Sequence, residues 1–171
     1  MVDVFNEQLV KQKPSPKDLI FKVLIVVAVL VIFLVSMAVI PGFGVIITAV
    51  AGFGAYILLG RLKREYEYIF TNGELDIDVI YNKATRKRVY NGYVKDFEIM
   101  AHAEDDSHKS AFAAANETKD YSTGVLSERS YTFLTVYKGK RVAITIEPND
   151  EMLAAITKVL TRRKFHPRKG V

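Results

Sequence analysis

The sequence contains no cysteine and no tryptophan, and it has only three histidines among its 171 residues. Without cysteine the chain can form no disulfide, no thiolate nucleophile and no cysteine-ligated zinc or iron–sulfur cluster. A more informative absence is that of charge, because residues 23–60 contain no Asp, Glu, Lys or Arg. All 24 basic and 19 acidic residues lie outside this segment, which excludes a purely soluble globular protein and leaves room for one compact domain beside it.

Two apolar runs make up the uncharged segment. The first extends from Val23 to Ile40 and the second from Phe43 to Leu59, and a Pro-Gly pair separates them. As a helix each run spans about 25–27 Å at ~1.5 Å per residue, close to the roughly 30 Å hydrocarbon core of a bilayer. Because Pro-Gly breaks a helix, the sequence predicts a two-helix transmembrane hairpin over residues 23–60.

A cleaved signal peptide is the alternative interpretation of the first run. Ser36, Met37 and Ala38 satisfy the small-x-small rule for cleavage behind an apolar core. The second apolar run, which follows at once, favours the hairpin. Both interpretations leave residues 61–171 in the cytoplasm.

Basic residues flank the hairpin on both sides, and none lies at its tip. Four lysines precede the first run, and Arg61, Lys63 and Arg64 follow the second. By the positive-inside rule, both termini are predicted to be cytoplasmic. The runs hold no ionisable residue from which a proton relay or ion path could be built, so a transporter or channel is not indicated.

Small residues form a stripe on the second run, because Thr48, Gly52 and Ala55 recur at helical spacing. Such a stripe lets a neighbouring helix approach closely. Packing against the first helix of the same chain is the favoured interpretation, and dimerisation is the alternative.

From Glu65 the hydrophobic pattern changes to period two, which is typical of strands. The pattern predicts two β-hairpins, over residues 65–81 and 131–146, with turns at Asn72-Gly73 and Lys138-Gly139. A basic turn over residues 83–88 is predicted to lead to a third strand. The strand pattern continues over residues 93–100, and Asn91-Gly92 forms either a tight turn or a bulge.

The rest of the cytoplasmic part is less regular. Residues 101–119 are predicted to form a loop with one short helical turn at residues 110–115, and residues 121–125 a short strand. Residues 148–151 then open an amphipathic helix whose apolar face carries Met152, Leu153, Ile156, Val159 and Leu160.

These elements predict an α+β fold: a transmembrane helical hairpin followed by a PH-like antiparallel β-sandwich or barrel capped by a C-terminal α-helix. Four parts are expected. Residues 1–22 form a cytoplasmic N-terminal segment, residues 23–60 the hairpin, residues 61–164 the PH-like domain, and residues 165–171 a basic tail.

After the apolar hairpin come the segments EYEYIFTNGELDIDVIYNKATRKR, DYSTG and YTFLTVYKGKRVAITIEPNDEML. This order resembles the bacterial PH-like membrane-anchored proteins, including a small family with the same two-helix hairpin and no established catalytic activity. The resemblance covers residues 5–163, most specifically Tyr68–Asp78 and Glu147–Leu153, and implies fold and topology. Asn72-Gly73 leaves no room for the basic loop of eukaryotic lipid-binding PH domains, so inositol-lipid recognition is not implied.

One cluster has metal-ligand chemistry: His102, Glu104, Asp105, Asp106 and His108. Two imidazoles with three carboxylates between them could bind a divalent ion if the loop folded back. Acidic loops are more often simply solvated, so no metal site is predicted. No triad spacing or phosphate-cradling glycine loop occurs either, and neither an enzyme nor a cofactor is expected.

Asp76 and Asp78 share one face of a predicted strand, as paired carboxylates do in some hydrolases. The favoured interpretation places both on the solvent face of an amphipathic strand.

Basic residues are the most suggestive feature of the cytoplasmic part. Near an anionic leaflet each such charge is worth about 1 kcal/mol of binding. The alternative is that they only set topology and solubility. The candidate membrane-surface residues are Arg61, Lys63, Arg64, Lys83, Arg86, Lys87, Arg88, Arg162, Arg163 and Lys164.

The sequence therefore predicts a non-catalytic PH-like module anchored by two spans in a bacterial plasma membrane. Its expected partners are a protein, another copy of itself or anionic lipid headgroups. A nucleic-acid partner is not expected, because residues 61–171 carry 20 basic and 16 acidic residues, a modest excess. The alternative function is a metal-dependent regulator or enzyme that uses the His102–His108 loop.

Overall fold

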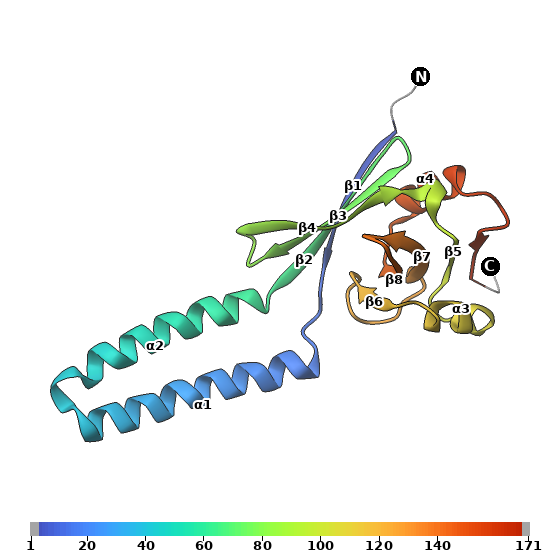
Figure 1. Cartoon of the computed structure of the whole chain (residues 1–171). Coiled ribbons are helices and arrows are strands. Elements are labelled where there is room, and N and C mark those ends of the chain that lie inside the picture. The colour runs from blue at the N-terminus through green and yellow to red at the C-terminus, as the bar shows by residue number, and fades with distance from the viewer. Residues whose placement is uncertain (1–3, 169–171) are drawn as a thin grey trace. The chain divides into compact units, whose positions relative to one another are not determined.

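The computed structural model describes residues 4–168, which form two compact units (Figure 1). The helical unit comprises residues 14–64 and 81–84. The sheet unit comprises the described residues of 1–13, 65–80 and 85–171.

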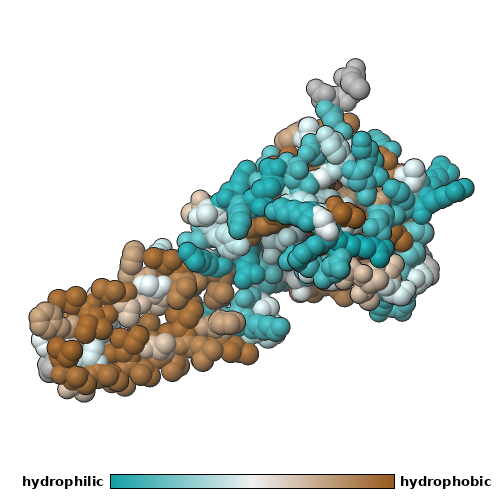
Figure 2. All heavy atoms as spheres, in the orientation of Figure 1, coloured by the Kyte–Doolittle hydropathy of each residue, from teal (hydrophilic) through white to brown (hydrophobic). Residues whose placement is uncertain are grey.

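Two long helices build the helical unit, α1 (Pro16–Val39) and α2 (Pro41–Arg61). A capping box fixes the start of α1, because Ser15 Oγ accepts from Asp18 N while the Asp18 carboxylate accepts from Ser15 N. Both helices are long and apolar enough to cross a membrane. Figure 2 shows hydrophobic residues over nearly all of the visible surface of these helices.

The two helices pack closely near the tip of the hairpin. Ser36 is buried, and its Oγ lies 3.3 Å from the Gly44 carbonyl oxygen, to which Thr48 Oγ1 also donates at 2.8 Å. A Cβ on Gly44 would lie only 3.0 Å from the Ser36 carbonyl oxygen, so a glycine is needed there. Thr48, Gly52 and Ala55 are all partly covered. Of this stripe, Thr48 lies in the contact between the helices, whereas a Cβ on Gly52 would meet no atom within 4 Å, so the packing of the whole stripe within the chain stays a prediction.

The first sheet has the strand order β1-β2-β3-β4. Its strands are β1 (Phe5–Lys11), β2 (Arg64–Thr71), β3 (Glu74–Tyr81) and β4 (Thr85–Tyr93). No strand was predicted for β1, which pairs antiparallel with β2 and places Lys11 opposite Glu65. The whole α1–α2 hairpin is thus inserted between two neighbouring strands of one sheet.

The turn between β3 and β4 is shorter than predicted. Asn82 and Lys83 have φ values of 50° and 56°, which is the left-handed conformation of a two-residue hairpin turn. Strand β4 therefore begins at Thr85, and the prediction of a basic turn over residues 83–88 is wrong: residues 86–88 belong to a strand.

Asn91-Gly92 forms no turn, since β4 continues through it. Arg88 and Asn91 both hydrogen-bond Asp76 although they are three residues apart. The alternation of the strand is interrupted between them, as at a β-bulge.

The second sheet has the order β6-β8-β7-β5-β9. Its strands are β5 (Ile99–His102), β6 (Glu117–Asp120), β7 (Tyr131–Tyr137), β8 (Lys140–Ile146) and β9 (Phe165–His166). The β7–β8 and β5–β7 pairs are antiparallel, whereas the outer pairs β6–β8 and β5–β9 are parallel. Three short helices interrupt the chain between β4 and β6: η1 (Val94–Asp96), η2 (Asp106–His108) and α3 (Lys109–Ala113).

One expectation for this sheet is wrong. The strand predicted at residues 121–125 lies earlier in the chain, at β6. Its position is determined by pairing with β8, because its own sequence has no apolar alternation. Phe165 and His166, at the start of the predicted basic tail, form the short strand β9, in which His166 pairs with Ala101. The short helical turn predicted at residues 110–115 is confirmed as α3.

Helix α4 (Asp150–Val159) packs its apolar face into the core. Asn149 caps its start by accepting from Met152 N at 2.8 Å, and Met152 and Ile156 are fully buried. Stacked rings of Phe97 and Phe133, with centroids 4.0 Å apart, lie in the same core. The predicted C-terminal helix is therefore confirmed; of its predicted apolar face Met152, Ile156 and Leu160 are buried, whereas Val159 is exposed.

Strand β1 is fastened to the junction between β8 and α4. Gln8 Nε2 donates to the Glu147 carbonyl at 2.9 Å, and Gln8 Oε1 accepts from Asn149 N at 2.7 Å. Tyr68 continues this connection, because its hydroxyl donates to the Tyr121 carbonyl and accepts from Glu147 N. Strand β1 is thus part of the sheet unit, although it precedes the two apolar helices in the sequence.

Candidate functional site

Four of the predicted basic residues gather at one end of the helical unit. This basal cluster consists of Arg61, Lys63, Arg64 and Lys83. The β3–β4 turn is held against the end of α2, because Asn82 N donates to the Lys63 carbonyl at 2.9 Å. The Asn82 side chain also lies against Gly60, where a Cβ would approach it to 3.3 Å.

The charged residues of the hairpin lie at one of its ends. Because α1 and α2 form a hairpin, the start of α1, which carries Lys17 and Lys22, lies at the same end as the finish of α2. Asp18 is the sole acidic residue between Pro14 and Arg64. The tip, which joins α1 to α2 around Ile40, has no charge at all.

Arg86 and Arg88 have a different role, since they bind carboxylates on the neighbouring strands. Arg86 lies 2.7 Å from Glu67, and Arg88 bridges Asp76 and Asp78. The hydrogen bond that Arg88 donates to the Asp78 carboxylate is the main cause that raises the pKa of Arg88 above its ordinary value. Asp78 is buried, so the prediction that both aspartates lie on a solvent face is wrong for it. These pairs join β4 to β2 and β3.

The three basic residues that follow α4 do not form one cluster of free charges. Arg162 and Arg163 are exposed, whereas Lys164 donates to the Lys95 carbonyl at 2.9 Å. Of the predicted basic tail, Lys169 lies outside the described residues, and Arg168 pairs with Glu128.

The side chains of the histidine loop, residues 102–108, do not point to one common site. His102 is buried, with Nε2 3.2 Å from the Ser127 carbonyl oxygen and Nδ1 accepting from Glu104 N. His108 instead pairs with Asp105 at 2.9 Å. Among residues 4–168, no group of three or more His, Asp or Glu side chains is placed to hold a metal ion.

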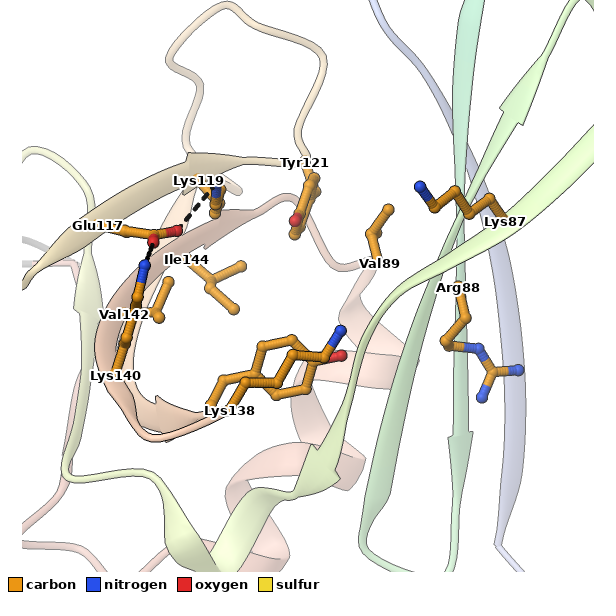
Figure 3. A pocket seen from close by; sticks show the side chains of 11 residues that line it. Lys87, Arg88, Val89, Glu117, Lys119, Tyr121, Lys138, Lys140, Val142 and Ile144 are labelled. Carbon is orange, nitrogen blue, oxygen red and sulfur yellow. Dashed lines mark hydrogen bonds and ion pairs between the residues drawn. The ribbon is translucent and has the colours of Figure 1, made fainter.

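A groove of about 410 Å³ lies in the sheet unit between β4 and β6 (Figure 3). Val142 and Ile144 form its apolar floor, and both are core residues of β8. Val89 and Tyr121 line its sides. The ammonium groups around the opening belong to Lys87, Lys119, Lys138 and Lys140.

Register explains why charged side chains of β6 line an apolar floor. Glu117 pairs with Val142 and Lys119 with Ile144, and registered partners lie on the same face of a sheet. Lys119 and Lys140 both form ion pairs with Glu117, at 3.1 and 2.5 Å. These pairs are the main cause that lowers the pKa of Glu117, with the hydrogen bond from Lys140 first.

Sequence reasoning missed this groove. Of its basic residues only Lys87 and Arg88 were singled out, and both were assigned to a turn. The others lie on β6, at the β7–β8 turn and at the start of β8, so only the pairing of β6 with β8 brings them together. The alternating charges of residues 117–120 carried no strand signal that could have revealed it.

Comparison with known proteins identifies a family. No curated protein and no solved structure matches the chain. A family model described as Bacterial PH-like domain (DUF6106) matches residues 2–166, which include β1, both apolar helices, both sheets and α4. The predicted PH-like α+β fold is thereby confirmed, and PH-like domains are generally non-catalytic. The chain belongs to the bacterial PH-like domain family.

Proposed function

We propose that this protein is a non-catalytic module that the α1–α2 hairpin anchors in a bacterial plasma membrane, with both termini in the cytoplasm. The basal cluster contacts anionic lipid headgroups of the inner leaflet. The anchor corresponds to residues 23–60 and the module to residues 61–164, completed by β1.

One observation carries this proposal: the cations of the hairpin lie at its base, and its tip is uncharged. Cytoplasmic ends of membrane helices carry such an excess of Lys and Arg, and anionic lipids attract them. Lys63 and Lys83 have exposed side chains that can reach a headgroup. The alternative function at the histidine loop has no such support, since His102 is buried and its ring nitrogens face partners within the fold.

The absence of cysteine allows a direct test of topology. Single variants Gly42→Cys and Ser107→Cys are treated in intact cells with a membrane-impermeant maleimide. We expect labelling at position 42 alone, because Gly42 lies at the hairpin tip and Ser107 in the sheet unit. Labelling at position 107 in intact cells would reverse the orientation and overturn the proposal.

Lipid contact is tested with the full chain in nanodiscs of phosphatidylcholine with or without phosphatidylglycerol. A lipid that binds the native state raises the melting temperature, so we expect a rise with phosphatidylglycerol that disappears at high salt. Lys63→Gln/Lys83→Gln should reduce this rise. The matched control Lys109→Gln/Lys158→Gln, at exposed sites on α3 and α4, should keep it. An equal rise in all three proteins would exclude the basal cluster as the lipid site.

A further inference from the structure

We propose that the loop between β6 and β7 makes a second contact with the membrane, in which its tip, Val125 and Leu126, inserts among the lipids at the cytoplasmic surface. This inference rests on the α1–α2 hairpin being a membrane anchor, as proposed above. It differs from the lipid contact of the basal cluster, because the tip is apolar and belongs to the sheet unit.

The first argument is the exposure of the tip. Val125 and Leu126 are 49% and 61% exposed, and they are neighbours in the chain. In the described part of the sheet unit, one other pair of neighbours, Val4 and Phe5, consists of exposed large hydrophobic residues. Apolar residues scattered singly over a surface need no explanation, whereas contiguous apolar surface marks contacts with a protein or a membrane. The tip is therefore a candidate contact surface.

The second argument is that polar contacts hold the loop on both sides of the tip. Thr123 N donates to the Glu147 carboxylate at 3.2 Å, and Ser127 Oγ donates to the same carboxylate. Between these two hydrogen bonds Gly124 has a φ of 80°, a left-handed conformation that turns the chain. The loop is thus fastened to the end of β8, while the two aliphatic side chains of the tip stay exposed.

The third argument is the place of the loop in the sheet unit. Lys11 ends β1 and pairs with Glu65 of β2, so the chain leaves for both apolar helices from the same end of the first sheet. Lys13 N donates to the Thr123 carbonyl at 2.8 Å, which fixes the loop at that end. Helix α1 begins at Pro16, three residues after Lys13, which is at most about 11 Å along the chain. With the helices in a membrane, two short connections therefore hold this end of the sheet unit close to the lipid surface.

The chemistry beside the tip favours lipid over a protein partner. Lys11 and Lys13 are exposed at the same end of β1, and segments that lie in the membrane interface combine apolar residues with such cations. The other exposed pair lacks this position, because Phe5 lies six residues from Lys11 at the opposite end of β1, about 20 Å away at ~3.3 Å per residue.

The experiment measures lipid contact at single positions of the full chain in nanodiscs of phosphatidylcholine and phosphatidylglycerol. Because the chain has no cysteine, Val125→Cys can carry an environment-sensitive fluorophore at one site. Nitroxide lipids labelled near the headgroup quench a fluorophore that reaches the interface. We expect quenching at position 125 to be at least threefold stronger than in Phe5→Cys, at the far end of β1. It should persist at salt concentrations that screen the basal cluster.

A second variant tests the native side chain and not the fluorophore. Leu126→Asp, introduced beside the label at position 125, changes an exposed residue and should leave the fold intact. It should reduce the quenching at least threefold, because a carboxylate at the tip opposes insertion among the lipids. The matched control Val136→Asp makes the same change at an exposed aliphatic residue of β7 and should leave the quenching unchanged.

A label on α1 separates failure of this inference from failure of the anchor. Leu34→Cys should be quenched by nitroxides placed deeper in the acyl chains. Quenching at position 34 without quenching at position 125 would overturn the loop contact, keep the anchor and leave a protein as the partner of the tip. No quenching at position 34 would overturn both.

Two further results would overturn the loop contact alone. One is equal quenching at positions 5 and 125, which would show that the fluorophore and not the tip seeks the lipid. The other is an equal effect of Leu126→Asp and Val136→Asp, including no effect of either.

Discussion

Glu147 is a residue at which several parts of the sheet unit meet. Its carboxylate accepts from Ser127 Oγ and from Thr123 N, while its backbone binds Gln8 and Tyr68. Burial acts to raise its pKa, but these hydrogen bonds to the ionised form prevail and lower it. The ionised side chain therefore stabilises the loop that precedes β7 against the end of β8.

A first prediction follows from this pKa. Since the pKa of Glu147 is lower in the folded state than in the unfolded state, its stabilisation is present above about pH 4.5 and disappears as the pH falls further. Glu147→Gln should lower the free energy of unfolding by about 1 kcal/mol at pH 7, a reduced value because the side chain is partly exposed. Melting curves of the full chain in detergent, measured between pH 3 and 8, should converge with those of the native protein at the acidic end.

Glu104→Gln, at an exposed position, is the matched control and should leave the melting curve unchanged at every pH. A constant difference between Glu147→Gln and the native protein across the whole range would show that the charge of Glu147 is not involved.

At the scale of single elements, α4 is the most direct link between the sequence and the core. Its apolar positions recur at helical spacing, its cap is an asparagine and its first turn is acidic, so its location and most of its buried face were predictable, although Val159 is exposed. Ile156 is fully buried and Ala154, two residues earlier, is exposed.

A second prediction uses that difference. Ile156→Asp buries an unpaired carboxylate and should cost several kcal/mol, enough to unfold a domain of marginal stability. Ala154→Asp places the same group on the solvent side of α4 and should change the melting temperature little. Circular dichroism and limited proteolysis of the full chain in detergent distinguish the two outcomes, and a folded Ile156→Asp variant would remove α4 from the core.

The strands that could not be predicted from the sequence were missed for one physical reason. Strands β2, β3, β7 and β8 carry their own alternation, and tight turns join two successive pairs of them. By contrast, β1 and β6 lie at sheet edges and are specified mainly by partners distant along the chain, as Lys11 with Glu65 shows. Their local sequences, FNEQLVK and ETKD, carry little apolar signal.

The candidate site was also predictable from the sequence only in part. The basal cluster could be predicted in large part, because Arg61, Lys63 and Arg64 follow directly after an apolar run. Lys83 joins them through the Asn82 turn, and no sequence pattern shows that contact. Arg86 and Arg88 were placed with the lipid-facing candidates because a sequence does not show which carboxylates lie across a strand.

At the scale of the whole molecule, the α1–α2 hairpin is an insertion in a β-hairpin. The chain enters the sheet unit as β1, leaves for α1 and α2, and returns as β2 beside its starting point. The pairing of Lys11 with Glu65 is the geometry that a two-residue turn would close. The helices are therefore dispensable for the connectivity of the sheet.

A third prediction follows from this connectivity. Replacing residues 12–64 by Asn-Gly should give a soluble, monomeric protein with one cooperative thermal transition. A fragment that begins at Glu65 lacks β1, the two hydrogen bonds of Gln8 and the buried Val10. It should lose roughly 3 kcal/mol, which corresponds to roughly 10–20 °C in melting temperature. Equal melting temperatures for the two proteins would mean that β1 contributes nothing to the sheet.

The same insertion sets an order of events during synthesis. β1 leaves the ribosome first, and its partner β2 follows only after residues 12–64 have been made, a delay of roughly 3–10 s at bacterial rates of translation. Throughout that interval Gln8 and Val10 have neither β2 nor the β8–α4 junction to bind. The first sheet can therefore be completed only after both apolar helices have been synthesised, so the folding of the sheet unit follows the synthesis of α1 and α2.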